Sequence, residues 1–288
     1  MLDKQVQQLL SEQLQDWPLA QKNYQALARV ETRSLNINGH TFLVQFNPGR
    51  IISSAAKVDA KSIQERKCFL CQHHLPPEQK GLPFTAKSGH EYMILCNPFP
   101  IFPRHLTIPD VQHTPQLIEG RLKDMLELAA LLPEYVLFYN GPKCGASAPD
   151  HFHFQAGNKD FLPLPQHIEQ GGSLKDYPLA YYILESEDSA TIPFLFTGIM
   201  EQIQQRQATQ DTEPMINLLC WKAEAKYYLV VFPRKAHRPT QFFAEGEANI
   251  LLSPATIDLA GVLITPQEKD FRKLSATDVK DIFKQISL

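Results

Sequence analysis

Two histidines and a glutamine alternate with two phenylalanines in residues 150–155, which read Asp-His-Phe-His-Phe-Gln. In an extended strand, successive side chains point to opposite faces. His151, His153 and Gln155 would therefore share one face, and the two phenyl rings would share the other. The aromatic face can be buried, and the polar face then presents two imidazoles and an amide. This pattern suits phosphorus chemistry with a histidine nucleophile.

A glycine-containing loop, residues 140–147, directly precedes this segment and reads Asn-Gly-Pro-Lys-Cys-Gly-Ala-Ser. Glycine allows the main chain to approach an anion closely, and the serine adds a hydroxyl donor. The candidate substrate-binding residues are Asn140, Lys143, Gly145 and Ser147 in this loop, and Arg50, which ends an Asn-Pro-Gly-Arg turn. One or more of them would bind phosphate oxygens.

The His-x-His-x-Gln pattern resembles the active-site strand of the histidine-triad superfamily. The similar branch contains galactose-1-phosphate uridylyltransferase, diadenosine tetraphosphate phosphorylase and the GDP-hexose phosphorylases, and residues 153–156 are most similar to the last of these. The resemblance implies that His153 attacks an α-phosphate and carries the nucleotide as a covalent phosphoramidate. Gln155 would donate to a phosphate oxygen; histidine-triad hydrolases usually have a third histidine there. Both intervening residues are Phe, unlike the uridylyltransferase pattern, which leaves the base and sugar open.

A Cys-x2-Cys pair lies far upstream of the histidines, as one half of a zinc site often does. The resemblance implies one structural zinc with four ligands, which would be Cys68, Cys71, His113 and His151. His105 is the alternative to His113. Neighbours on one face of a strand are about 6.6 Å apart, so a zinc on His151 need not touch His153. A closed site with four protein ligands lacks the open position of a catalytic zinc.

Composition limits the class of protein. Hydrophobic residues make up 43% of the 288 residues, which is enough for a packed core. A net charge of −3 argues against a dedicated nucleic-acid binder. The N-terminus lacks the apolar core of a signal peptide, and no apolar run is long enough to span a bilayer. Five cysteines, two of them suited to zinc, fit a cytoplasmic protein.

Several elements are expected to position these residues. Helical spacing predicts helices over residues 1–30 and 115–132, and after the capping-box-like start at Ser275. Strands are expected at 40–47, 91–96, 104–108, 135–139 and 151–155. Together with the resemblance, this order predicts an α+β fold with a histidine-triad-like antiparallel sheet and flanking helices.

A faint internal repeat suggests how the chain is divided. Pro-x3-His-x-Pro occurs at residues 109–115 and again at 233–239, each time after an apolar strand. We therefore expect two histidine-triad-like halves, 1–180 and 181–288, within one compact unit. The second half lacks His-x-His-x-Gln, so it would be degenerate and each chain would have one active centre.

Three functional hypotheses remain open. The first is a nucleotidyltransferase or phosphorylase that acts on a nucleoside-diphosphate sugar or related nucleotide, with inorganic phosphate or a sugar phosphate as acceptor. The second is a dinucleoside-polyphosphate phosphorylase or hydrolase. The third is a zinc-stabilised nucleotide-binding protein without turnover. The sequence also leaves open whether the chain forms a homodimer.

Overall fold

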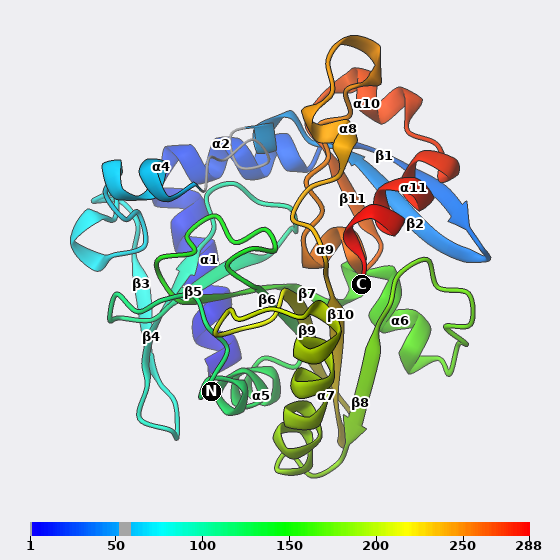
Figure 1. The fold of residues 1–288 in the computed structure, drawn as a ribbon. Coiled ribbons are helices and arrows are strands. Elements are labelled where there is room, and N and C mark those ends of the chain that lie inside the picture. The colour runs from blue at the N-terminus through cyan, green and yellow to red at the C-terminus, as the bar shows by residue number, and fades with distance from the viewer. Residues whose placement is uncertain (1, 52–58) are drawn as a thin grey trace.

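The structure is a computed structural model that describes residues 2–51 and 59–288, and it contains two sheets with helices around them (Figure 1). The large sheet has the strand order β3-β4-β5-β7-β6-β9-β10-β8, and every neighbouring pair is antiparallel. The small sheet has the order β1-β2-β11. The expected α+β fold with a large antiparallel sheet is confirmed.

The strands of the large sheet are β3 (Gly81–Thr85), β4 (Glu91–Cys96), β5 (His105–Pro109), β6 (Tyr135–Asn140), β7 (His153–Asn158), β8 (Tyr182–Ser186), β9 (Ile216–Ala223) and β10 (Lys226–Pro233). Those of the small sheet are β1 (Glu31–Ile37), β2 (His40–Phe46) and β11 (Val262–Thr265). The α-helices are α1 (Leu2–Asp16), α2 (Pro18–Leu27), α4 (Ala60–Glu65), α5 (Leu122–Leu131), α6 (Pro163–Glu169), α7 (Thr191–Gln207), α8 (Thr240–Phe243), α9 (Thr256–Leu259), α10 (Glu268–Lys273) and α11 (Ala276–Ile286). Short 3-10 turns are η1 (Pro48–Arg50), η2 (Gln72–His74), η3 (Lys159–Phe161) and η4 (Gly246–Ala248).

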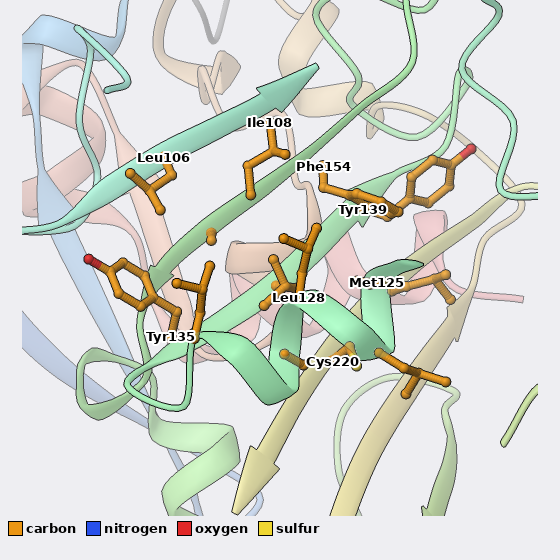
Figure 2. Close-up of a cluster of buried hydrophobic side chains, with 14 of the residues drawn as sticks. Leu106, Ile108, Met125, Leu128, Tyr135, Tyr139, Phe154 and Cys220 are labelled. Atoms are coloured by element: carbon orange, nitrogen blue, oxygen red, sulfur yellow. The ribbon is translucent and has the colours of Figure 1, made fainter. Parts of the chain in front are cut away.

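The large sheet is covered on both faces, so its central strands are almost entirely buried. One face packs against α1, α2, α5 and α7, and Leu106, Ile108 and Phe154 point into this core (Figure 2). The other face packs against the small sheet and against α10 and α11. Because side chains alternate along a strand, His153 and Gln155 of β7 lie on this second face.

The N-terminal helical prediction holds except for one break. Residues 1–30 were expected to form one helix, but α1 ends at Asp16 and α2 begins at Pro18. Trp17 between them is extended, with φ −113° and ψ 99°, because a proline disfavours the helical conformation in the residue before it. At the other end of the chain, the capping box of Ser275 and Asp278 starts α11 as expected.

The helix predicted from Pro115 to Leu132 is too long. Only α5, from Leu122, is helical, and the preceding residues form turns. Gly120 has a φ of +74°, which a right-handed helix cannot contain. The segment before it leaves the helical path so that Gln116 can reach the active-site strand.

The active-site strand also begins later than expected. β7 begins at His153, so His151 and Phe152 precede it. The alternation of faces nevertheless holds for the aromatic residues: Phe152 and Phe154 are both fully buried, and their rings meet edge to face with centroids 4.9 Å apart.

The two Pro-x3-His-x-Pro segments follow β5 and β10 of the single large sheet. The division into halves 1–180 and 181–288 stays a prediction. Within residues 2–51 and 59–288, no helix combines the length and apolar character needed to cross a membrane.

Candidate active site and metal cluster

His153 has the surroundings of a neutral nucleophile. Its Nδ1 donates to the carbonyl oxygen of His151 at 2.9 Å, which fixes the proton on Nδ1. Its Nε2 has no hydrogen-bond partner among the described residues, so the lone pair there is available. Burial lowers the pKa of His153 to about 4, although the hydrogen bond to the His151 carbonyl opposes the shift. The ring is therefore uncharged near neutral pH.

Gln116 holds the main chain of His153 in place. β6 and β7 pair only as far as Phe138 and Gln155, so their ends nearest the active site lack ladder hydrogen bonds. The fully buried Gln116 bridges the gap. Its Oε1 accepts from the N–H of His153 at 2.7 Å, and its Nε2 donates at 3.0 Å to the carbonyls of His153 and Asn140.

Gln155 is oriented by His105. The N–H of Ile101 donates to Nδ1 of His105 at 3.2 Å, so the neutral ring carries its proton on Nε2. That nitrogen donates to Oε1 of Gln155 at 3.0 Å. Burial and the charge of Arg50 lower the pKa of His105 to about 3, so this single tautomer persists near neutral pH. The amide nitrogen of Gln155 is thereby turned away from His105 as a free donor.

Asn140 at the end of β6 is oriented in the same way by residues far along the chain. Its Oδ1 accepts from Nδ2 of Asn217 at 2.8 Å, and from both the N–H and the hydroxyl of Thr256 at 3.0 and 2.7 Å. The oxygen is therefore saturated, and the amide nitrogen has no partner among the described residues. It is available as a donor to a ligand.

The loop after Asn140 offers further donors. Gly145 has a φ of +99°, and a Cβ added there would lie 2.9 Å from Cβ of Ala255, so only glycine fits. The N–H groups of Gly145, Ala146 and Ser147 have no main-chain acceptor in the described part of the chain. Lys143, by contrast, is a surface residue whose Nζ lies 2.7 Å from Asp211.

Two arginines that could bind phosphate have different environments. Arg50 donates to the carbonyl of Phe99 at 2.7 Å, while its buried Nε has no partner among the described residues. Arg234 is fully buried and donates to Asn217 and to three main-chain carbonyls. Arg234 thereby holds Asn217, which in turn orients Asn140.

The four predicted metal ligands lie together, and their ligand atoms are all within 4.8 Å of one another. Sγ of Cys68 is 3.2 Å from Nδ1 of His151, and Sγ of Cys71 is 3.2 Å from Nδ1 of His113. His105, the alternative ligand, is instead hydrogen-bonded to Gln155. These four residues could hold a metal ion, and two thiols with two imidazoles are a donor set typical of zinc.

Neighbouring groups orient His151 and favour the thiolate form of Cys68, as metal binding requires. Nε2 of His151 donates to the carbonyl of Asp110 at 2.8 Å, which leaves Nδ1 as the ligand atom. Burial alone would raise the pKa of the Cys68 thiol, but hydrogen bonds, above all from His151, lower it to about 6. Arg66 pairs with Asp150 at 2.5 Å and so ties the cysteine segment to the residue before His151.

Comparison with known proteins agrees with this architecture. A family model described as a domain of unknown function (DUF4922) matches residues 9–158, slightly more than half of the chain. The search of curated proteins gives no match.

Solved structures of yeast Ap4A phosphorylase Apa2 are similar over almost the whole chain. The complex with Ap4A has a TM-score of 0.67 at 16% identity, with 98% of this chain and 97% of that chain covered. A second structure of the enzyme has a TM-score of 0.65 at 17% identity, with 97% of each chain covered. The complex with AMP has a TM-score of 0.62 at 19% identity, with 97% and 96% covered. The histidine-triad-like fold expected from residues 150–155 is confirmed. The chain belongs to the DUF4922 family, and its fold is similar to that of yeast Ap4A phosphorylase.

Proposed function

We propose that this protein is a nucleotidyltransferase or phosphorylase that works through a covalent nucleotidyl-histidine. The observation that carries the proposal is the state of His153: neutral, held through Nδ1, and with a free Nε2. The substrate would be a nucleotide with at least two linked phosphates. Dinucleoside polyphosphates and nucleoside-diphosphate sugars are the two classes to compare, the first because the similar yeast enzyme is an Ap4A phosphorylase.

The first step is attack by the Nε2 lone pair of His153 on the α-phosphorus. A nitrogen–phosphorus bond forms, the bond to the leaving phosphate oxygen breaks, and that oxygen takes the electron pair. The carbonyl of His151 keeps its hydrogen bond from Nδ1 and stabilises the positive charge that the ring gains. In the second step an oxygen of inorganic phosphate or a sugar phosphate attacks the same phosphorus. The nitrogen–phosphorus bond then breaks, and the ring is neutral again.

The surrounding donors stabilise the charge on the transferred phosphoryl oxygens. We assign this role to the amide nitrogens of Gln155 and Asn140 and to the loop of Gly145 and Ser147. Arg50 supplies positive charge beyond Gln155. Lys143 remains a candidate only if its ion pair with Asp211 opens.

The metal in this proposal is one structural zinc per chain, bound by Cys68, Cys71, His113 and His151. Its four protein ligands would fill a tetrahedral site, so zinc would bind no reacting group and would clamp the cysteine segment to the chain just before β7. Such ligands require reduced cysteines, which suits a protein of the cytoplasm.

The test is to trap the covalent intermediate. Purified protein is mixed with α-phosphate-labelled Ap4A and, separately, with a labelled GDP-hexose, without acceptor. We expect acid-labile, base-stable label on His153, and release of that label as a nucleoside diphosphate when phosphate is added. His153→Ala should lower labelling by on the order of 10⁴-fold or more while the protein stays folded. Turnover of either substrate at the wild-type rate by His153→Ala would refute the proposal.

A further inference from the structure

Two chains of hydrogen bonds run from one proline-rich segment, residues 97–101, to the active-site face of the sheet. The first passes from the N–H of Ile101 through His105 to Oε1 of Gln155. Every link in it has a fixed direction, because a main-chain N–H can only donate. The chain therefore ends on the amide nitrogen of Gln155, which must donate outward.

The second chain of hydrogen bonds runs in the same donor-to-acceptor direction and ends on Thr107. The N–H of Phe99 donates to Oδ1 of Asn97 at 2.9 Å, which fixes the orientation of that amide. Nδ2 of Asn97 then donates to Oγ1 of Thr107 at 2.9 Å. The Thr107 oxygen is thus an acceptor within the protein, and its hydroxyl hydrogen has no acceptor among residues 2–51 and 59–288.

The ends of these two hydrogen-bond chains, Gln155 and Thr107, lie side by side. Thr107 of β5 is the direct cross-strand partner of Gln155 of β7, so both side chains lie on the same face of the sheet. Directly opposite residues of an antiparallel pair have Cβ atoms roughly 5 Å apart. Thr107 is 9% exposed, and Gln155 is half-buried. Two neighbouring donors, the Thr107 hydroxyl hydrogen and the Gln155 amide nitrogen, would suit a ligand that offers acceptor oxygens.

Thr107 lies on the side of Gln155 that is remote from Asn140. β7 has β6, with Asn140 and the glycine-containing loop after it, on one side, and β5, with Thr107, on the other. Arg50 donates to the carbonyl of Phe99 in the proline-rich segment and is close enough for its charge to act on His105 of β5, and its buried Nε is unpaired among the described residues. Hydrogen-bond donors thus continue past Gln155 on the β5 side, next to a strand whose His105 senses the charge of Arg50.

We propose that Thr107 is a further substrate-binding residue, whose hydroxyl and the amide of Gln155 together donate to the phosphate next to the one that His153 attacks. This inference rests on the proposed function for the identity of the attacked phosphate. The same place would hold the leaving phosphate in the first step and the attacking phosphate in the second. Its ligand class is an anionic phosphate group, whose unprotonated oxygens accept hydrogen bonds.

The first test needs no turnover and uses inorganic tripolyphosphate, titrated into the zinc-loaded protein by calorimetry. Thr107→Val keeps the shape and removes the hydroxyl, and we expect about tenfold weaker binding from the loss of a hydrogen bond to a charged group. Thr107→Ser restores the hydroxyl and should bind within about twofold of wild type. Equal affinities of wild type and Thr107→Val, or no binding to the wild type, would overturn the inference.

The second test examines the hydrogen-bond chain with Asn97→Asp. A carboxylate there accepts from the Thr107 hydroxyl, so that the hydroxyl points away from the ligand. We expect Asn97→Asp to bind tripolyphosphate more weakly than the wild type. In the double variant with Thr107→Val, the loss of affinity should be smaller than the product of the two single fold-changes. Fully multiplicative effects would mean that the new charge acts alone, and would overturn the proposed chain.

The labelling experiment separates this inference from the proposed function. Covalent labelling of the wild type, with tripolyphosphate affinity unchanged in Thr107→Val, would leave the function standing and remove Thr107 from the site. Tripolyphosphate binding that depends on Thr107, without label on His153 from either nucleotide, would keep the phosphate site and refute the nucleotidyl-transfer chemistry.

Discussion

His151 and His153 are two residues apart, and a main-chain carbonyl holds each ring, but through opposite nitrogens. His151 donates from Nε2 to Asp110, which leaves Nδ1 toward the cysteines. His153 donates from Nδ1 to His151, which leaves Nε2 free. For each ring, the position of its carbonyl partner decides which nitrogen is left to bind a metal or to attack phosphorus.

The two rings also differ in charge preference. Burial lowers the pKa of His153 to about 4. Burial also lowers the pKa of His151, but the hydrogen bond with Cys68 and others outweigh it, so the pKa is raised overall. The pKa of His151 is raised by its contact with the Cys68 thiol, and a metal ion would displace that proton because zinc binds the neutral ring; burial keeps His153 neutral. Adjacent histidines can thus serve different roles without sharing a ligand.

Removing the metal should produce the largest effect on stability. Cys68→Ser is expected to lose zinc and to lower the free energy of unfolding by about 4 kcal/mol, since binding of a structural metal adds to folding. Metal analysis and denaturant unfolding measure both quantities.

Two histidines serve as controls for this prediction. His74→Ala, outside the four ligands, should retain the metal, whereas His113→Ala should lose it. Zinc content unchanged in Cys68→Ser, or lost only with His105→Ala, would contradict the assigned cluster.

Loss of the His105 hydrogen bond should affect chemistry more specifically. His105→Phe keeps an aromatic ring but leaves Gln155 free to rotate, so labelling of His153 should slow about tenfold per folded protein. In a Gln155→Ala background the same substitution should add little, because the oriented group is already absent. Equal slowing in both backgrounds would show that His105 acts only through packing.

The smallest predicted effect concerns the fate of the intermediate. Gln155 cannot take a proton from water, whereas a histidine there could titrate near neutral pH. We expect the wild type to turn over faster with phosphate than without it, and Gln155→His to raise the hydrolysed fraction a few-fold even if total activity falls. The measured quantity is the ratio of product without phosphate to product with it. A ratio of one in the wild type would indicate a hydrolase.

Local sequence was sufficient for some of this site. The alternation of residues 151–155, the Cys-x2-Cys spacing and the resemblance identified the histidines and all four members of the cluster. The helix at 115–132 was wrong because the apolar spacing continues through residues that instead bring Gln116 to His153. A turn that is stabilised by a hydrogen bond to a distant residue produces no periodic pattern of apolar residues in the sequence.

The residues that orient Asn140 and Gln155 could not be found from sequence, since they lie far from these two residues in the chain. Asn140 is oriented by Asn217 and Thr256, which follow it by 77 and 116 residues. His105 and Gln155 are 50 residues apart. No spacing rule relates such pairs, because the sheet order that brings them together is a property of the whole fold.

The assignment of His151 as metal ligand and His153 as nucleophile can be tested most directly by NMR of the zinc-loaded protein with ¹⁵N-labelled histidine. We predict that His153 carries its proton on Nδ1 and stays neutral until the pH falls toward about 4, as burial dictates. His151 should carry its proton on Nε2, with Nδ1 bound to zinc. A His153 protonated on Nε2 near neutral pH, or a ring that titrates near 6.5, would contradict its role as the nucleophile.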